Sequence, residues 1–177
     1  LWAEGAGYKG IVAEGWDPVL GWRSPNFLYS PTGTSKIKLL LKNYRLSDDI
    51  AFRFSEQSWK EWPLNADKFA GWVSCANGNG QLINLFMDYE TFGEHQWEST
   101  GIFNFLNHLP GEILKHPDNN FVTVEEAVAA YRPLGEIDVP RVITWADTER
   151  DLSAWLGNEL QTSAIRFLYD LEPLIMA

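Results

Sequence analysis

The sequence has little of what a disulfide-stapled secreted protein or a membrane protein requires. It contains one cysteine, Cys75, so no internal disulfide can form, and we expect this residue to be a small buried side chain on a helix. No apolar run approaches the roughly 20 residues that span a bilayer, and no signal peptide or lipidation motif opens the chain. The first residue is leucine rather than methionine. We therefore expect the chain to begin inside a longer protein, and we expect a cytoplasmic location because no targeting segment is visible.

Positive charge is also scarce, with 14 basic against 24 acidic residues and a formal net charge of −10. Nucleic acids and anionic membranes are bound through positive surface, so this balance argues against both as partners. The motifs that mark nucleotide, metal and serine-nucleophile sites are missing too: GxGxxG, the P-loop, HExxH, paired CxxC and GxSxG. The expectation is therefore a protein without a cofactor and without a metal.

The 177 residues do have a globular composition, with 45% hydrophobic residues and nine tryptophans. Apolar runs that alternate with amphipathic stretches predict an α/β chain. The predicted strands are residues 8–12, 27–29, 37–41, 82–87 and a run within 139–145. The predicted helices are residues 47–52 capped by Ser47, 66–76, 99–108, 123–131 opened by a Thr123/Glu126 capping box, and 149–171 ended by Pro173.

Acidic residues follow three of the predicted strands: Glu14, Asp88 and Asp147. In an α/β barrel the chemistry lies at the carboxyl ends of the strands, so this pattern is typical of a barrel. The strands are too few to close one. We therefore expect residues 1–147 to form the later strands and helices of an incomplete barrel, and residues 148–177 to form a helix that follows it in the same structural unit.

The block FMDYETFGEHQW, residues 86–97, is the richest in chemistry. If the strand continues to Glu90, Asp88 and Glu90 lie on one face, where mutual repulsion and aromatic neighbours raise the pKa of at least one carboxyl. A carboxyl that stays protonated near neutral pH suits the acid of a glycosidase. Alternatively, the two carboxylates cap the next helix. His95 can orient a carboxylate, bind substrate or ligate a metal together with the two acids.

Tryptophan rings stack on the apolar faces of sugars, and four of the nine lie beside predicted loops: Trp16, Trp22, Trp97 and Trp145. Trp22 and Trp145 are equally consistent with stacking surface and with core. Trp72 and Trp155 lie on helical apolar stripes, which predicts core positions. Asp147 lies at a predicted strand-to-helix junction, where it can cap the helix and contact substrate.

Four blocks resemble, in order, the α-amylase branch of glycoside hydrolase family 57: residues 7–29, 37–55, 86–97 and 145–158. The resemblance covers almost the whole chain, and FMDYETFGEH is its most specific segment. It implies a (β/α)7 barrel followed by a helical region, and retaining hydrolysis of α-glucans by two carboxylates. It also implies that Asp88 is the general acid/base.

The nucleophile that the resemblance implies is a glutamate in a segment like FRNTEL, and this sequence contains no such segment. We therefore expect the nucleophile to precede Leu1, Glu14 to have a structural or substrate-binding role, and the chain alone to be inactive. The remaining expected substrate contacts are Glu90, His95, Trp22, Trp145 and Asp147.

The leading hypothesis is thus a fragment of an α-glucan hydrolase acting on starch, glycogen or maltodextrin. A 4-α-glucanotransferase or branching enzyme of the same family is the first alternative, since it differs only in accepting the glycosyl group on a sugar hydroxyl. A sugar-binding protein that kept the fold without the chemistry is the second. All three have an α-glucan polysaccharide or oligosaccharide as partner.

Overall fold

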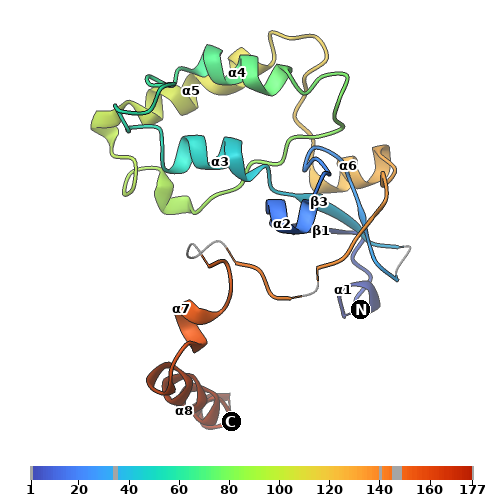
Figure 1. The fold of residues 1–177 in the computed structure, drawn as a ribbon, viewed down its shortest axis with the longest axis vertical. Helices are drawn as coiled ribbons and strands as arrows, with labels where there is room; N and C mark the ends of the chain where they lie inside the picture. The colour runs from blue at the N-terminus through green and yellow to red at the C-terminus, as the bar shows by residue number, and fades with distance from the viewer. Residues whose placement is uncertain (1, 34–35, 140, 145–148, 177) are drawn as a thin grey trace. The chain divides into compact units, whose positions relative to one another are not determined.

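A computed structural model describes residues 2–33, 36–139, 141–144 and 149–176 (Figure 1). The chain divides into two compact units, Leu1–Asp138 and Val139–Ala177. Within the described residues, no helix combines the length and the apolar character needed to cross a bilayer. The boundary expected at residues 147 and 148 lies outside the described ranges and stays a prediction.

The two longest strands of the first unit form a parallel pair. β1 (Gly10–Ala13) pairs with β3 (Lys38–Leu41), with Gly10 opposite Lys38 and Ala13 opposite Leu41. β3 is the more deeply buried strand, as the apolar run Leu39-Leu40-Leu41 predicts. The carboxyl ends of both strands therefore reach the same edge.

A second, shorter parallel pair joins β2 (Ser30–Pro31) to β4 (Glu136–Ile137). Tyr29 makes an antiparallel bridge to Leu39, which connects this pair to β3. Two single-turn helices, α1 (Trp2–Gly5) and α2 (Asp17–Leu20), flank β1 along the chain.

Three helices carry the larger apolar core: α3 (Tyr44–Ala51), α4 (Ala66–Ser74) and α5 (Ile102–Ile113). α4 and α5 lie side by side (Figure 1). Edge-to-face rings stabilise their contact, with 5.9 Å between the centroids of Phe69 and Phe105. The buried core side chains are Ile50, Phe54, Leu64, Ala66, Phe69, Ala70, Ile102, Phe105, Leu109 and Ile113.

The helix α6 (Val124–Ala130) packs on β3 through Val128, which contacts the buried Leu40. Its first turn is closed by the predicted capping box: Thr123 Oγ1 accepts from the Glu126 backbone N–H at 3.2 Å, and Glu126 Oε2 accepts from the Thr123 N–H at 2.7 Å. At its other end, Lys38 Nζ donates to backbone carbonyl oxygens of the last turn.

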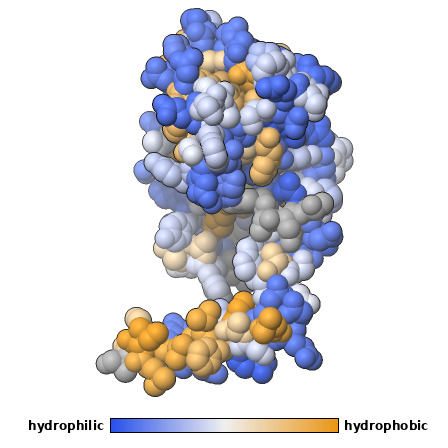
Figure 2. Space-filling model, turned by 90° about the vertical axis from the view of Figure 1, so that its left-hand side faces the viewer, coloured by the Kyte–Doolittle hydropathy of each residue, from blue (hydrophilic) through white to orange (hydrophobic). Residues whose placement is uncertain are grey.

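The second unit contains α7 (Ser153–Leu156) and α8 (Glu159–Met176), and neither helix has a buried residue. Large apolar side chains of α8 are exposed instead, as the orange surface in the lower part of Figure 2 shows. They are Leu160, Phe167, Leu168, Tyr169, Leu174, Ile175 and Met176.

The sequence-based predictions are confirmed where short-range signals are strongest. β3 falls within the apolar run 37–41, and β1 overlaps the predicted strand 8–12. α4 begins directly after Asn65, although the Asn65 side chain makes no capping hydrogen bond. The mixed α/β class is confirmed, whereas the barrel itself stays a proposal, since the described residues form only short parallel pairs.

Several helix and strand boundaries differ from those predicted from the sequence. The helix expected from Ser47 begins at Tyr44, because the Asn43 side chain accepts the Leu46 N–H at 3.1 Å and caps the helix one turn earlier. The strand predicted over 82–87 is wrong: that segment makes one parallel bridge, Lys42 to Asn84, because it meets only the end of β3.

Other differences lie further along the chain. Residues 27–29 precede β2 rather than forming it, and the described part of 139–145 is not a strand. α5 starts at Ile102, since residues 98–100 form a 3-10 turn before Gly101. The helix expected over 149–171 is two helices, and α8 continues past Pro173 to Met176.

Two burial predictions are also wrong. Cys75 is exposed, because α4 ends at Ser74, just before it. Trp155 is 45% exposed on the short α7, none of whose residues is buried. Trp72, by contrast, is half-buried and packs against the core, with its ring centroid 6.0 Å from that of Trp59.

Gly15 allows the chain leaving β1 to pass the end of β3, and this close approach generates the first prediction. A Cβ at residue 15 would lie 2.1 Å from the Lys42 carbonyl oxygen, a backbone atom that cannot move aside easily. We expect Gly15→Ala to lower the free energy of unfolding by about 3 kcal/mol. Chemical denaturation followed by circular dichroism measures this change.

The matched control is Gly71→Ala in the middle of α4, where an added Cβ meets nothing within 4 Å. This variant should be unchanged or more stable by about 0.5–1 kcal/mol, since alanine favours a helix. Equal effects of the two substitutions would contradict the close approach.

Candidate active site

Three chain segments meet at one edge of the first unit. β1 leads into Glu14, β3 leads into Lys42, and residues 82–87 run beside the end of β3. Backbone hydrogen bonds join them: the Lys42 N–H donates to Ala13 O at 2.8 Å, and the Asn43 N–H donates to Asn84 O at 2.8 Å. These bonds bring the residues after β1 and β3 to one edge, whereas the gathering of Glu14, Asp88 and Asp147 stays a prediction.

The centre of this edge is a buried ion pair between Glu14 and Lys42. Glu14 Oε2 lies 3.9 Å from Lys42 Nζ, and the two side chains are only 3% and 4% exposed. The Gly15 N–H also donates to Glu14 Oε1, at 3.0 Å. Lys42 Nζ lies 5.9 Å from the centroid of the Phe86 ring. These contacts hold one carboxylate in a defined position.

Asp88 follows Phe86 by two residues and is exposed. A 3-10 turn, η1 (Tyr89–Thr91), begins immediately after it, and Asp88 O accepts the Thr91 N–H at 3.1 Å. The extended backbone therefore does not continue to Glu90. Since Asp88 and Glu90 are both exposed, the predicted desolvation of a same-face acidic pair is wrong for the described chain.

The segment after η1 turns back on itself before α5. Phe92 bridges to Gln96, and Gly93 takes a φ of 114° in the turn. Gln96 anchors the turn, since it is buried and donates through Nε2 to Ala51 O at 2.9 Å. His95 is exposed in this turn. In the part of the chain that is described, no three histidine, cysteine or acidic side chains form a group that could hold a metal.

Trp22 is 87% exposed on the loop after α2, so the core alternative for this residue is wrong. The Arg23 guanidinium carbon lies 5.4 Å from the centroid of its ring. The other expected substrate contacts after the last predicted strand, Trp145 and Asp147, lie outside the described residues.

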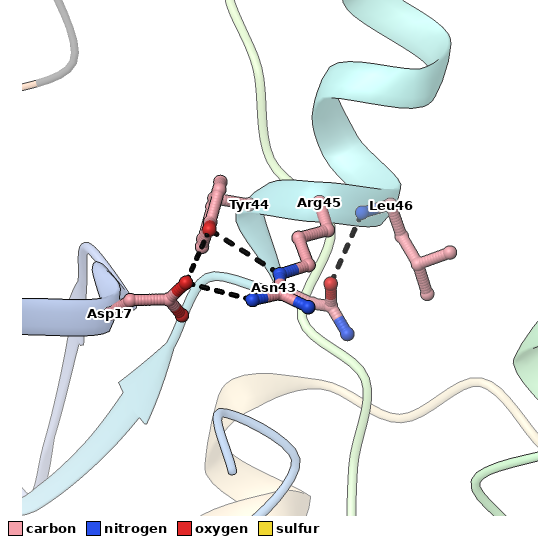
Figure 3. A network of polar contacts seen from close by, with 5 residues as sticks. All are labelled: Asp17, Asn43, Tyr44, Arg45 and Leu46. Atoms are coloured by element: carbon pink, nitrogen blue, oxygen red, sulfur yellow. Dashed lines mark hydrogen bonds and ion pairs between the residues drawn. The ribbon is translucent and has the colours of Figure 1, made fainter. Parts of the chain in front are cut away.

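A polar network that the sequence did not reveal lies at the same edge (Figure 3). Asp17 Oδ2 accepts from the Tyr44 hydroxyl and from Arg45 Nη2, both at 2.8 Å, and Arg45 Nε donates to the Tyr44 oxygen at 3.3 Å. Hydrogen bonds from Arg45 and then Tyr44 hold the pKa of Asp17 below its ordinary value. The sequence feature that could have indicated this network is the polar run Asn43-Tyr44-Arg45, which follows an apolar strand almost directly.

The buried ion pair generates a second prediction. Lys42→Met leaves Glu14 buried without its cation, so we expect a loss of about 3 kcal/mol or more of unfolding free energy. Lys115→Met is the matched control, because Lys115 pairs with Glu112 at 2.6 Å but is 70% exposed. That variant should lose less than about 1 kcal/mol in the same denaturation experiment. A small effect of Lys42→Met would contradict a buried, paired Glu14.

Comparison with known proteins agrees with the resemblance of the sequence blocks. The family model of Glycosyl hydrolase family 57 matches residues 2–140. A protein of Methanocaldococcus jannaschii named "Putative alpha-amylase" is 53% identical over 176 residues, which is 98% of this chain and 37% of that protein. The chain thus spans just over a third of the length of this relative.

The fold is similar to that of a solved structure, a 4-alpha-glucanotransferase from Thermococcus litoralis. The TM-score is 0.61 at 18% identity, over 96% of this chain and 26% of that one. At this identity the likeness concerns the fold alone. On the family match and the 53% identity, the chain belongs to glycosyl hydrolase family 57.

Proposed function

We propose that this chain contributes the carboxyl-edge site of a retaining α-glucan hydrolase, with Asp88 as general acid/base. The family membership and the name of the Methanocaldococcus jannaschii relative support the reaction class. The observation that carries the proposal is the shared edge, where β1 and β3 run parallel and end together, and where the segment leading to Asp88 joins them through the parallel bridge of Asn84 to Lys42. In the same proposal, β1 and β3 are strands of a (β/α)7 barrel in the natural full-length protein, and the segment leading to Asp88 follows them at the barrel edge.

A retaining mechanism needs a second carboxylate across the reaction centre. We assign this role to Glu14. It replaces the glutamate that the sequence blocks led us to expect before Leu1. Glu14 directly follows β1, and contacts connect it to the segment before Asp88: Glu14 pairs with Lys42, and Lys42 lies against Phe86. Its burial and pairing supply the fixed geometry that a nucleophile requires.

The other carboxylates near this edge suit the role less well. Asp17 is exposed, and two donors occupy its Oδ2. Glu90 is exposed on the 3-10 turn beyond Asp88. Glu14 alone among these three combines burial with an ion pair to a buried cation.

The proposed reaction follows from these roles. Asp88, protonated, donates its proton to the glycosidic oxygen while a Glu14 carboxylate oxygen attacks the anomeric carbon and the leaving sugar departs. Asp88, now a carboxylate, takes a proton from water as the water oxygen displaces Glu14 from the anomeric carbon. Both carboxyl groups return to their starting states, and the anomeric configuration is retained.

The remaining contacts are proposed from the sequence blocks. Trp22 offers an exposed ring for stacking, and Glu90 and His95 lie on the exposed turn next to Asp88. Trp145 and Asp147 stay predictions. If a sugar hydroxyl replaces water in the second step, the same residues perform glucanotransfer, the activity named for the Thermococcus litoralis protein.

For Asp88, we expect Asp88→Asn in the natural full-length protein to lower starch hydrolysis by about 10² or more, because the amide cannot donate the proton. Reducing-sugar release measures the rate, and circular dichroism verifies folding. Asp118→Asn is the control, an exposed aspartate outside the proposed site. Near-normal activity of Asp88→Asn would show that another group is the acid.

For Glu14, we expect Glu14→Gln to lower hydrolysis by about 10³ or more while keeping nearly the same side-chain volume. In Glu14→Ala, added azide should restore turnover of an activated α-glucoside, yielding a glycosyl azide of inverted anomeric configuration. A Glu14→Gln variant that folds and keeps activity within about tenfold of the unmodified protein would remove Glu14 from the nucleophile role.

A further inference from the structure

A surface cavity of about 470 Å³ lies beside the proposed reaction centre and is not used by the mechanism above. Its wall comes from two places in the chain, α2 with the following loop and the start of α3. These are the residues that follow Glu14 after β1 and Lys42 after β3. The polar lining residues are Asp17, Arg23, Ser24, Asn26, Asn43, Tyr44 and Arg45.

The polar groups of this cavity are held in place before any ligand binds. Asp17 is fixed by Tyr44 and Arg45 (Figure 3), and Asn43 Nδ2 donates to Asn26 Oδ1 at 3.0 Å. Asn43 is itself fixed, because its Oδ1 accepts from the Leu46 N–H. A site whose side chains are already oriented loses little conformational entropy on binding.

The network leaves an acceptor and a donor next to each other. Among the described residues, both hydrogen bonds to Asp17 end on Oδ2, and Arg45 uses Nε and Nη2. Asp17 Oδ1 and Arg45 Nη1 thus remain for a ligand with an adjacent hydrogen-bond donor and acceptor. Two neighbouring hydroxyls of a pyranose match this pattern, whereas a phosphate would be repelled by the carboxylate.

The network has little value for stability alone. The Arg45 and Asp17 side chains are 71% and 49% exposed, and ion pairs of this exposure contribute at most about 1 kcal/mol. Arg45 nevertheless keeps the pKa of Asp17 below its ordinary value, so the carboxylate stays ionised in neutral and mildly acidic solution. Binding is the better explanation for a preformed charged pair in an open cavity.

An exposed aromatic ring lies close to a residue of the cavity wall. Trp22 is 87% exposed, and the guanidinium carbon of Arg23, which lines the cavity, lies 5.4 Å from the centroid of its ring. Sugars present an apolar ring face beside their hydroxyls, so a ring next to the cavity and a polar pair in its wall fit the same ligand.

We propose that this cavity is a subsite for one glucosyl unit of an α-glucan, next to the reaction centre, with Asp17 and Arg45 binding vicinal hydroxyls and Trp22 stacking on the ring. This inference rests on the proposed function and deepens it. The subsite positions the glucan chain relative to Glu14 and Asp88 without taking part in bond breaking.

The test is maltotriose binding by calorimetry, using the natural full-length protein with Asp88→Asn to suppress turnover. We expect Asp17→Asn and Trp22→Ala each to raise the Kd about tenfold, the effect of losing one charge-assisted hydrogen bond or one stacking contact. The matched control is Asp49→Asn, which breaks an ion pair to Arg53 (2.7 Å) on the same helix, α3, without touching the cavity. Its Kd should stay within about twofold of the parent.

Three outcomes overturn the subsite: no maltotriose binding by the parent, an Asp17→Asn Kd equal to that of Asp49→Asn, or a Trp22→Ala Kd equal to that of the parent. Because Trp22 is almost fully exposed, its variant tests the subsite even if Asp17→Asn fails to fold. Failure of the proposed hydrolase function gives a different result from failure of the subsite. In that case the unmodified protein releases no sugar from starch, while maltotriose binding still depends on Asp17 and Trp22.

Discussion

Two opposite charges buried at the end of a two-stranded parallel sheet constrain this fold more than any other contact. Glu14 and Lys42 are each nearly inaccessible, so neither can stay charged in the interior without the other. Parallel pairing of β1 and β3 in one register brings them to the same edge. Gly15 lets the chain pass the Lys42 backbone without a clash. The Glu14–Lys42 ion pair therefore depends both on this glycine and on the register of β1 and β3.

The edge built around this pair also organises the proposed chemistry. The segment leading to Asp88 joins it through the bridge of Asn84 to Lys42, and Phe86 covers the lysine. Asp17 and Arg45 follow the same two strands and line the neighbouring cavity. The proposed nucleophile, the proposed acid and the proposed sugar subsite thus all come from residues that follow chain segments meeting at one edge, the arrangement that serves catalysis in α/β barrels.

Sequence reasoning was most successful where the signal is local. The apolar run of β3 and the Thr123/Glu126 capping box could be read directly, and the family was identifiable from its ordered blocks. It was less successful where contacts with residues distant in the sequence decide strand pairing and burial. Residues 82–87 have a strand composition, yet they pair with only the end of β3, and composition cannot reveal how many partners a segment has. The exposed Cys75 and Trp155 show the same limit for burial.

Tertiary contacts also decided which polar residues belong to the site. The network of Asp17 with Tyr44 and Arg45 joins residues 27 and 28 positions apart, so no local pattern marks it. Likewise, the carboxylate of Glu14 became a candidate nucleophile only when its burial and its cation were visible.

The central claim, that Glu14 forms the covalent bond to the sugar, is tested most directly by trapping that bond. The full-length protein is incubated with a 5-fluoro α-glucosyl fluoride, which slows hydrolysis of the glycosyl–enzyme, and is then digested for peptide mass spectrometry. The account predicts a fluoroglucosyl adduct on Glu14 in the peptide that continues from β1. An adduct on any other carboxylate, with Glu14 unmodified, would contradict it.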